Sequence, residues 1–323
     1  MEQVEKLARE GGFGFMPIGK VKVKRARYLI KDVLLKEVFT FISALAKAGK
    51  TTLALHLAIC LTTGRLFLNR YPVRRCKVLY ICLEDHLGEV KQKVKYMLKG
   101  KQFPKHLYLL NTKSLSLPTD FQKLEADIEK SKAEVVIFDT FRRSHSCEEN
   151  SSTEMAPILS PIRKMIRDFK FAAVIIHHAG REVDKKDNPG DWLRGSSDFN
   201  GVWEGLIALD RQRDKTNMRI FRKYASDFNI SYKIIKGENV DKLTGDFPIV
   251  DLHYIDVESE NHTEEESRVY DILKEVPVSA NTLEDKLKGK LSRPKIDSTL
   301  QRLLNKDRIK RKGKGKNTTW YAV

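Results

Sequence analysis

The stretch Ser43-Ala-Leu-Ala-Lys-Ala-Gly-Lys-Thr-Thr52, SALAKAGKTT, follows the apolar run VFTFI at residues 38–42 and precedes the helix-like TTLALHLAICL at residues 51–61. This order predicts a buried strand, a tight turn and a helix. Backbone N–H groups in such a turn converge on an anion, and the positive end of the helix helps to hold it. The stretch therefore predicts a phosphate-binding loop of the type G-x-x-x-x-G-K-[S/T].

Ala44 stands where that pattern has its first glycine. The first position chiefly starts the turn, whereas Gly49 is where the backbone must approach the ligand closely, so alanine at position 44 is compatible with a working site. Lys50 is expected to reach the β- and γ-phosphates of ATP, and the Thr51 hydroxyl to bind Mg²⁺. The loop residues predicted to contact the nucleotide are Ala44, Lys47, Ala48, Gly49, Lys50, Thr51 and Thr52, the last of them chiefly as a helix-start residue.

Two further apolar runs are followed by carboxylates. AEVVIFDTF ends its strand in Asp139, which could bind Mg²⁺ beside the phosphate loop or, alternatively, serve only as a turn or cap residue. KVLYICLED carries Glu84 and Asp85 past its strand end. We assign Glu84 as the base that activates the attacking water and Asp85 as the cap of the following helix, although either could be the cap.

FAAVIIHHAGRE ends a strand in His177 and His178. Paired histidines at a strand end, followed by a basic polar loop, suit a sensor that hydrogen-bonds the γ-phosphate and signals its presence to that loop. The alternative is a pair of structural core histidines.

Apolar runs alternate with amphipathic stretches from Val38 to His178, which predicts an α/β fold with a mostly parallel sheet flanked by helices. Three strand-like runs follow, WEGLIALD, MRIFRKY and ISYKII, and are expected to extend the sheet as antiparallel strands. We expect an N-terminal basic arm at residues 1–30, an ATPase domain at 31–258 and a small domain at 263–323.

The 323-residue chain has a formal net charge of +17, which points to a polyanionic partner, although a lysine-rich surface that serves solubility is the alternative. Its four cysteines lack metal-ligand spacing, and no membrane helix or secretory signal is expected. These features predict a cytoplasmic protein with reduced thiols.

The motifs AKAGKTTLALHLA, LYICLEDHLGEV, VVIFDTFRRS, IIHHAGR and LRGSSD occur in that order between about residues 28 and 235. Together they resemble the RecA-like ATPases, and most closely the RepA-type hexameric replicative helicases of plasmids and phages. This resemblance implies a hexameric ring with ATP between subunits. The implied roles are Lys50 and Thr51 for phosphate and Mg²⁺, Asp139 for Mg²⁺, Glu84 as base and His178 as sensor.

The resemblance also implies a basic residue that completes the site of the neighbouring subunit, and MRIFRKYASD supplies Arg222 and Lys223 as candidates. The alternative for both is a pair of charges that protect a sheet edge. Residues 180–197 match the loop that binds single-stranded DNA in the channel of relatives. Its expected DNA contacts are Arg181, Lys185, Lys186, Arg194 and a base-stacking Trp192, unless Trp192 packs on the core of a solvated loop.

Residues 263–323 predict three helices and two basic strands around Gly313–Gly315, with Trp320 packing the strands onto the helices. This pattern resembles a winged helix, whose third helix enters a DNA groove while the hairpin contacts phosphates. A winged helix that binds protein is the alternative. The expected duplex contacts are Lys295, Arg302, Lys310, Arg311, Lys312, Lys314 and Lys316.

The combined prediction is an ATP- and Mg²⁺-dependent motor on DNA, specifically a replicative helicase of a mobile element that works as a homo-oligomer without a membrane partner. The first alternative is a DNA-binding regulator that uses ATP as an assembly switch without unwinding. A strand-exchange protein ranks third, because a C-terminal winged helix is not usual in that architecture.

Overall fold

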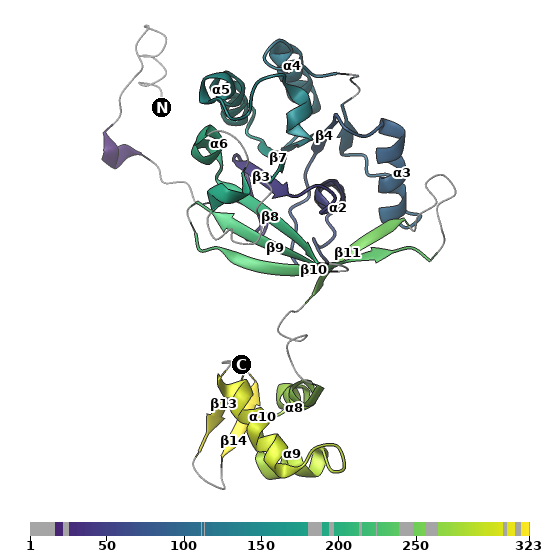
Figure 1. Cartoon of the computed structure of the whole chain (residues 1–323), viewed down its shortest axis with the longest axis vertical. Coiled ribbons are helices and arrows are strands. Elements are labelled where there is room, and N and C mark those ends of the chain that lie inside the picture. The colour runs from purple at the N-terminus through teal and green to yellow at the C-terminus, as the bar shows by residue number, and fades with distance from the viewer. Residues whose placement is uncertain are drawn as a thin grey trace. The chain divides into compact units, whose positions relative to one another are not determined.

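The computed structural model describes residues 17–21, 26–110, 112, 114–179, 189–193, 197–212, 215–223, 225–238, 248–255, 264–305, 309–313 and 318–322. The chain divides into two compact units (Figure 1). The first comprises the chain up to Asn229 together with Ile234–His253, and the second comprises Ile230–Lys233 together with Tyr254–Val323. Tyr28–Ile30, in the expected N-terminal arm, form strand β1, which pairs with β2 (Leu34–Leu35).

The predicted strand, turn and helix at the phosphate loop are confirmed. Strand β3 (Phe39–Ala44) is buried along its whole length, and helix α2 (Lys50–Thr63) starts with Gly49 as its N-cap. Gly64, in the left-handed conformation, ends the helix and donates its N–H to Cys60 O. Eleven of the fourteen residues of α2 are buried, so the helix is anchored inside the unit and supports the loop that precedes it.

The large sheet has nine strands in the order β11-β10-β9-β8-β3-β7-β6-β4-β5. Strands β8, β3, β7, β6, β4 and β5 pair in parallel, so the predicted α/β class with a mostly parallel sheet is confirmed. The remaining strands of this sheet are β4 (Val78–Cys82), β5 (Leu107–Leu109), β6 (Val135–Asp139), β7 (Ala172–His178), β8 (Gly205–Gln212), β9 (Lys215–Arg222), β10 (Phe228–Lys236) and β11 (Ile249–Ile255).

One prediction about the sheet needs correction. Strand β8 runs parallel to β3, with Ala44 opposite Leu209, and only then does β9 turn back antiparallel to β8. The end of β8 therefore reaches the same edge of the sheet as the phosphate loop. Strand β8 can run parallel to β3 because the chain crosses over from the end of β7 to the start of β8, and helix α6 (Ser197–Val202) is part of this crossover.

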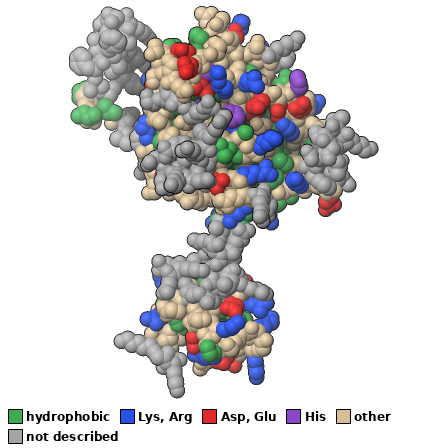
Figure 2. All heavy atoms as spheres, in the orientation of Figure 1, with side chains coloured by type: hydrophobic (Ala, Val, Ile, Leu, Met, Phe, Trp, Pro, Cys, Tyr) green, Lys and Arg blue, Asp and Glu red, His purple; other side chains and the backbone are tan. Residues whose placement is uncertain are grey.

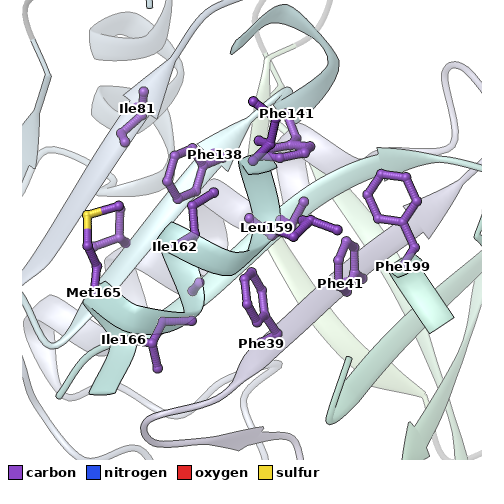
Figure 3. Packing of buried hydrophobic residues seen from close by; sticks show 14 of the residues in the cluster. Phe39, Phe41, Ile81, Phe138, Phe141, Leu159, Ile162, Met165, Ile166 and Phe199 are labelled. Atoms are coloured by element: carbon purple, nitrogen blue, oxygen red, sulfur yellow. The ribbon is translucent and has the colours of Figure 1, made fainter. Parts of the chain in front are cut away.

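Helices cover both faces of the sheet, with α4, α5 and α6 on one face and α2 and α3 on the other (Figure 1). Alternate residues of the central strands, such as Phe39, Phe41 and Phe138, join side chains of α4, α5 and α6 in one buried cluster (Figure 3). Complete burial of each such side chain contributes about 1.5–3 kcal/mol. The bounds of these helices are α3 Leu87–Met97, α4 Phe121–Ser131 and α5 Ser152–Phe169.

The second unit contains the three predicted helices, α8 (Glu264–Glu275), α9 (Ala280–Lys286) and α10 (Arg293–Asn305). Strands β13 (Ile309–Lys312) and β14 (Thr319–Ala322) form the predicted antiparallel pair, and a short strand β12 (Val278–Ser279), which was not predicted, joins β14. Trp320 packs against the buried cluster of this unit, as expected. Among the described residues, no helix is long and apolar enough to cross a membrane.

Candidate functional site

The six parallel strands of the sheet have their carboxyl ends at one edge. Their register sets Ala44 opposite both His178 and Leu209, and Cys82 opposite Asp139. The loops that follow these strands carry the predicted site residues, so segments more than 130 residues apart in sequence meet beside the phosphate loop. The carboxyl edge of a parallel sheet is where such folds bind ligands.

The phosphate loop turns through two residues with positive φ, Lys47 at 61° and Gly49 at 94°. Lys50 follows as the first residue of α2, and its side chain folds back over the loop. Its Nζ donates hydrogen bonds to Leu45 O at 2.9 Å and Ala44 O at 3.2 Å, and lies 3.4 Å from His178 Nδ1. The ammonium group is thus placed inside the turn formed by the loop.

Burial lowers the pKa of Lys50, while the nearby carboxylates of Glu84 and Asp139 act in the opposite direction. The lysine is only 6% exposed, and a cation in such a site attracts an anionic ligand more strongly than it would in water. The carboxylates of Glu84 and Asp139 therefore lie close enough to Lys50 to favour its charged form.

Thr51 and Asp139 meet as predicted for a Mg²⁺ site. The Thr51 hydroxyl donates a hydrogen bond to Asp139 Oδ1 at 3.1 Å, and the Tyr80 hydroxyl donates one to Asp139 Oδ2. Burial raises the pKa of Asp139 to about 6, although both hydrogen bonds favour the carboxylate. A hydroxyl and a carboxylate are hard oxygen ligands, so this pair fits Mg²⁺ shared with the phosphates of a nucleotide.

Glu84 is exposed at the end of β4 and lines a cleft of about 600 Å³. The other lining residues of this cleft are Thr140, Arg142, Arg143, His145, Ser146 and His178. A carboxylate in this position faces the space beyond the phosphate loop, where an attacking water would lie. Asp85 is not the helix cap that we expected, because α3 has His86 at its N-cap and the Asp85 carboxylate accepts a hydrogen bond from Lys93.

The two adjacent histidines of β7 differ in environment. His178 is partly exposed, lines the cleft and lies beside Lys50. His177 is 2% exposed and points into the protein between Phe41 and Phe199, with ring centroids 6.3 and 4.8 Å away. Only His178 is placed to contact a bound nucleotide.

Arg222 and Lys223 lie at the other edge of the sheet. Arg222 pairs with Gly205 at the start of β8, so neither residue can reach the phosphate loop of its own chain. The Arg222 guanidinium forms an ion pair with Asp32 at 3.3 Å and lies 5.0 Å from the Phe228 ring centroid. The Lys223 side chain donates one long hydrogen bond, to Gly201 O at 3.5 Å, and its backbone N–H donates to Glu204 O at 3.1 Å.

The burial of Trp192 contradicts its predicted role in base stacking. Its side chain is 5% exposed and belongs to the main buried cluster, and its carbonyl oxygen accepts a hydrogen bond from Ser43. A buried indole cannot stack on a nucleotide base without leaving the core. The other predicted channel-loop contacts, Arg181, Lys185, Lys186 and Arg194, lie outside the described residues.

In the second unit, Lys310, Arg311 and Lys312 are exposed along β13. Lys295 is exposed on α10 but pairs with Glu265 at 2.8 Å, so part of its charge is neutralised locally. Arg302 lies on α10, and its side chain, like Lys314 and Lys316, lies outside the described part.

Sequence reasoning missed a second cleft of about 350 Å³ on the other side of the phosphate loop. It is lined by residues 45–48 of the loop and by Leu209, Asp210 and Arg211. Arg211 donates a hydrogen bond to Lys47 O at 3.2 Å. The sequence does contain a signal for this cleft, because charged residues directly follow the apolar run of β8. The prediction that β8 is antiparallel placed these charged residues at the wrong edge of the sheet. The contact of Tyr80 with Asp139 was also missed, because the sequence of a buried strand does not show which residue a tyrosine hydroxyl will contact.

A family model described as the AAA domain matches residues 19–184, just over half of the chain. Among solved structures, the crystal structure of the RadB recombinase is similar to this chain at 15% sequence identity and a TM-score of 0.44. That match covers 62% of this chain and 88% of the other. No curated protein matches the chain.

Proposed function

This chain belongs to the AAA domain family, and from that premise we propose that it is an ATP-hydrolysing motor that acts on DNA. The observation that carries the proposal is the meeting of Lys50, Thr51, Asp139, Glu84 and His178 at one sheet edge. These groups supply the parts of phosphoryl transfer, namely a cation and a metal site for the phosphates, a base for water and a contact for the γ-phosphate.

Each side chain has a separate task in this proposal. Lys50 binds the phosphates, Glu84 orients and deprotonates the attacking water, and His178 hydrogen-bonds the γ-phosphate. Thr51 and Asp139 would hold Mg²⁺, which would neutralise phosphate charge when bound. The nucleoside would lie in the second cleft, where Asp210 and Arg211 supply polar groups.

The proposed assembly is a ring in which a basic residue from the neighbouring subunit completes each site and stabilises the transferring phosphoryl group. Of the two candidates we assign this role to Lys223, because Arg222 is held by Asp32 and Phe228 of its own chain. We propose a hexamer, by the resemblance to RepA-type helicases.

For DNA, we propose that residues 180–197 contact single strands and that the second unit is a winged helix that binds duplex. Lys and Arg side chains are spread over both units in the view of Figure 2, with acidic side chains among them. Lys310, Arg311 and Lys312 give the second unit an exposed basic strand suited to phosphate contacts. This set of activities describes a replicative helicase of a mobile element in the cytoplasm.

The decisive test is nucleotide hydrolysis and strand separation by the full chain. We expect Mg²⁺-dependent ATP hydrolysis, stimulated by single-stranded DNA and abolished in Lys50→Ala, while the exposed helix variant Lys130→Ala behaves like the wild type. A tailed duplex should be unwound with ATP. The absence of nucleotide binding would refute the proposal, whereas DNA-stimulated hydrolysis without unwinding would favour the ATP-switched regulator.

A separate variant tests the duplex site. Replacement of Lys310, Arg311 and Lys312 by alanine should weaken duplex binding and reduce its dependence on salt concentration, because each phosphate contact releases counterions. Hydrolysis stimulated by single strands should remain. Unchanged duplex affinity would favour the alternative in which this unit binds protein.

A further inference from the structure

Two buried histidines and a partly buried glutamate form a cluster beside the partly exposed His178. It consists of His177 on β7, His145 after the short helix at Phe141–Ser144, and Glu149 four residues later. Glu149 Oε1 lies 3.7 Å from His177 Nε2 and 3.8 Å from His145 Nε2. The imidazole side chains are 1% and 0% exposed, so both nitrogens meet the carboxylate away from bulk solvent.

The proton position on His177 follows from its neighbours. Its Nδ1 lies 2.8 Å from His178 O, and a carbonyl oxygen can only accept, so Nδ1 carries the proton and donates it. Burial lowers the pKa of His177 to about 4, which keeps the ring neutral near pH 7. The other nitrogen, Nε2, then carries a lone pair; it lies 3.7 Å from Glu149 Oε1, too far for a hydrogen bond, and two acceptors do not bond to each other.

The ring of His177 is also fixed by packing. Phe41 comes from the strand that leads into the phosphate loop, and Phe199 from α6, so the imidazole is held between two elements of the core. Burial lowers the pKa of His145 as well, with Arg142 adding to this effect, and the His145 ring packs 5.0 Å from Phe141. The cluster therefore links β7 to the segment after Asp139.

A continuous path of contacts joins this cluster to the nucleotide site. Lys50 Nζ lies beside His178, the carbonyl of His178 is held by His177, and His177 faces Glu149. Glu149 itself borders a second opening of about 310 Å³ that shares Arg142 and His178 with the larger cleft. A displacement of His178 towards a γ-phosphate would therefore also displace residues 142–150.

We propose that His177 is a positioning residue, which holds the His178 peptide so that its imidazole can distinguish a nucleoside triphosphate from a diphosphate. This inference rests on the proposed function and adds to it the residue that sets the sensor. His177 supplies the hydrogen bond that fixes the peptide. The rings of Phe41 and Phe199 keep the His177 ring in the orientation that this hydrogen bond requires.

The test compares the affinities of a non-hydrolysable Mg·ATP analogue and Mg·ADP in the full chain, together with kcat and KM. His177→Phe keeps an aromatic ring but removes the hydrogen bond to His178 O. It should reduce the preference for the triphosphate about tenfold, which corresponds to one good hydrogen bond, and raise the KM for Mg·ATP in the same direction. Affinity for Mg·ADP should stay within about twofold of the wild type.

Two conservative variants separate the proposed contacts. His177→Asn can place an N–H group near the Nδ1 position, so it should regain most of the lost preference. Glu149→Ala removes a carboxylate that forms no hydrogen bond with His177, so discrimination should stay within about twofold of the wild type. Ile176→Ala serves as the control, because it removes buried packing on the same strand without touching a polar contact.

The inference is overturned if His177→Phe discriminates between the two nucleotides like the wild type, or if Ile176→Ala loses discrimination to the same extent at a similar loss of thermal stability. A wild-type chain that binds neither nucleotide refutes the proposed function, and this inference with it. Normal discrimination by the wild type with an unaffected His177→Phe refutes the positioning role alone.

Discussion

Two buried histidines make the stability of the first unit depend on pH. His56 on α2 is 0% exposed and its Nε2 accepts a hydrogen bond from the Leu68 N–H at 3.1 Å, so a proton on Nε2 would break that contact. Burial lowers its pKa from 6.5 to about 3, with the charge of Arg65 adding to the effect, and burial lowers the pKa of His177 to about 4. Both rings are neutral when folded at pH 7.

The sign and size follow from proton linkage. Between the folded and unfolded pKa values the unfolded chain binds more protons, so stability falls as the pH drops below about 6.5 and the loss ends near the folded values. Moving from pH 7 to pH 5 changes the free energy of unfolding by about 2 kcal/mol for each histidine. The two histidines together contribute a loss of about 4 kcal/mol. Asp139 opposes it by about 1 kcal/mol, because its folded pKa of about 6 lies above the ordinary value of 3.8 and the folded state takes up the proton first. The net loss of about 3 kcal/mol is a large part of the ~5–15 kcal/mol typical of a folded domain.

Urea unfolding at pH 7 and pH 5 measures this loss. In a Trp320→Phe background the fluorescence of the two remaining tryptophans reports the first unit alone. His56→Gln should reduce the loss by about 2 kcal/mol, to about 1 kcal/mol, because one of the two titrating histidines is gone. His86→Gln, an exposed control, should leave the loss unchanged. A wild-type loss below about 1 kcal/mol, or an equal loss in His56→Gln, would refute the reasoning.

Three further predictions concern single side chains. Glu84→Gln should still bind Mg·ATP but hydrolyse it about 10²–10⁴-fold more slowly, since the proton acceptor is lost; unchanged turnover in a steady-state assay would move the role elsewhere. Trp192→Ala should lower the free energy of unfolding by about 3–5 kcal/mol in urea titrations, as expected for a buried indole and not for an exposed DNA contact. Lys223→Ala protomers mixed with Lys50→Ala protomers should regain hydrolysis at hybrid interfaces, whereas Arg222→Ala should chiefly reduce thermal stability; mixed oligomers that stay inactive would contradict a site completed in trans.

The fold was predictable because its signal is local. Apolar runs such as VFTFI and VVIFD are long enough to be buried strands, and the helices between them give the parallel connection. The same locality explains the failures. Trp192 stands among polar residues in the sequence, and its burial depends on a distant contact with Ser43. The direction of β8 depends on the crossover through α6, which apolar periodicity does not reveal.

The candidate site was predictable to the same degree. Asp139 ends β6, and Lys50 and Thr51 begin the helix that follows the phosphate loop after β3, so the parallel order of the sheet brings them to one edge. His145 and Glu149 follow no strand directly, and their approach to His177 depends on the path of a loop. Side chains placed by register can be assigned from sequence, whereas side chains placed by loops need coordinates.

Ala44 illustrates how the register decides what a motif position requires. It is the last residue of β3, fully buried and paired with His178 and Leu209, and its carbonyl accepts a hydrogen bond from Lys50. Because the turn takes its positive φ values later, alanine here is unstrained, and Ala44→Gly should leave Mg·ATP affinity unchanged while costing about 0.5–1 kcal/mol of stability. Gly49→Ala meets no atom within 4 Å but must adopt a φ of 94°, so it should distort the loop and weaken Mg·ATP binding. Calorimetry in which Ala44→Gly binds Mg·ATP much more tightly than the wild type would show instead that alanine impairs the site.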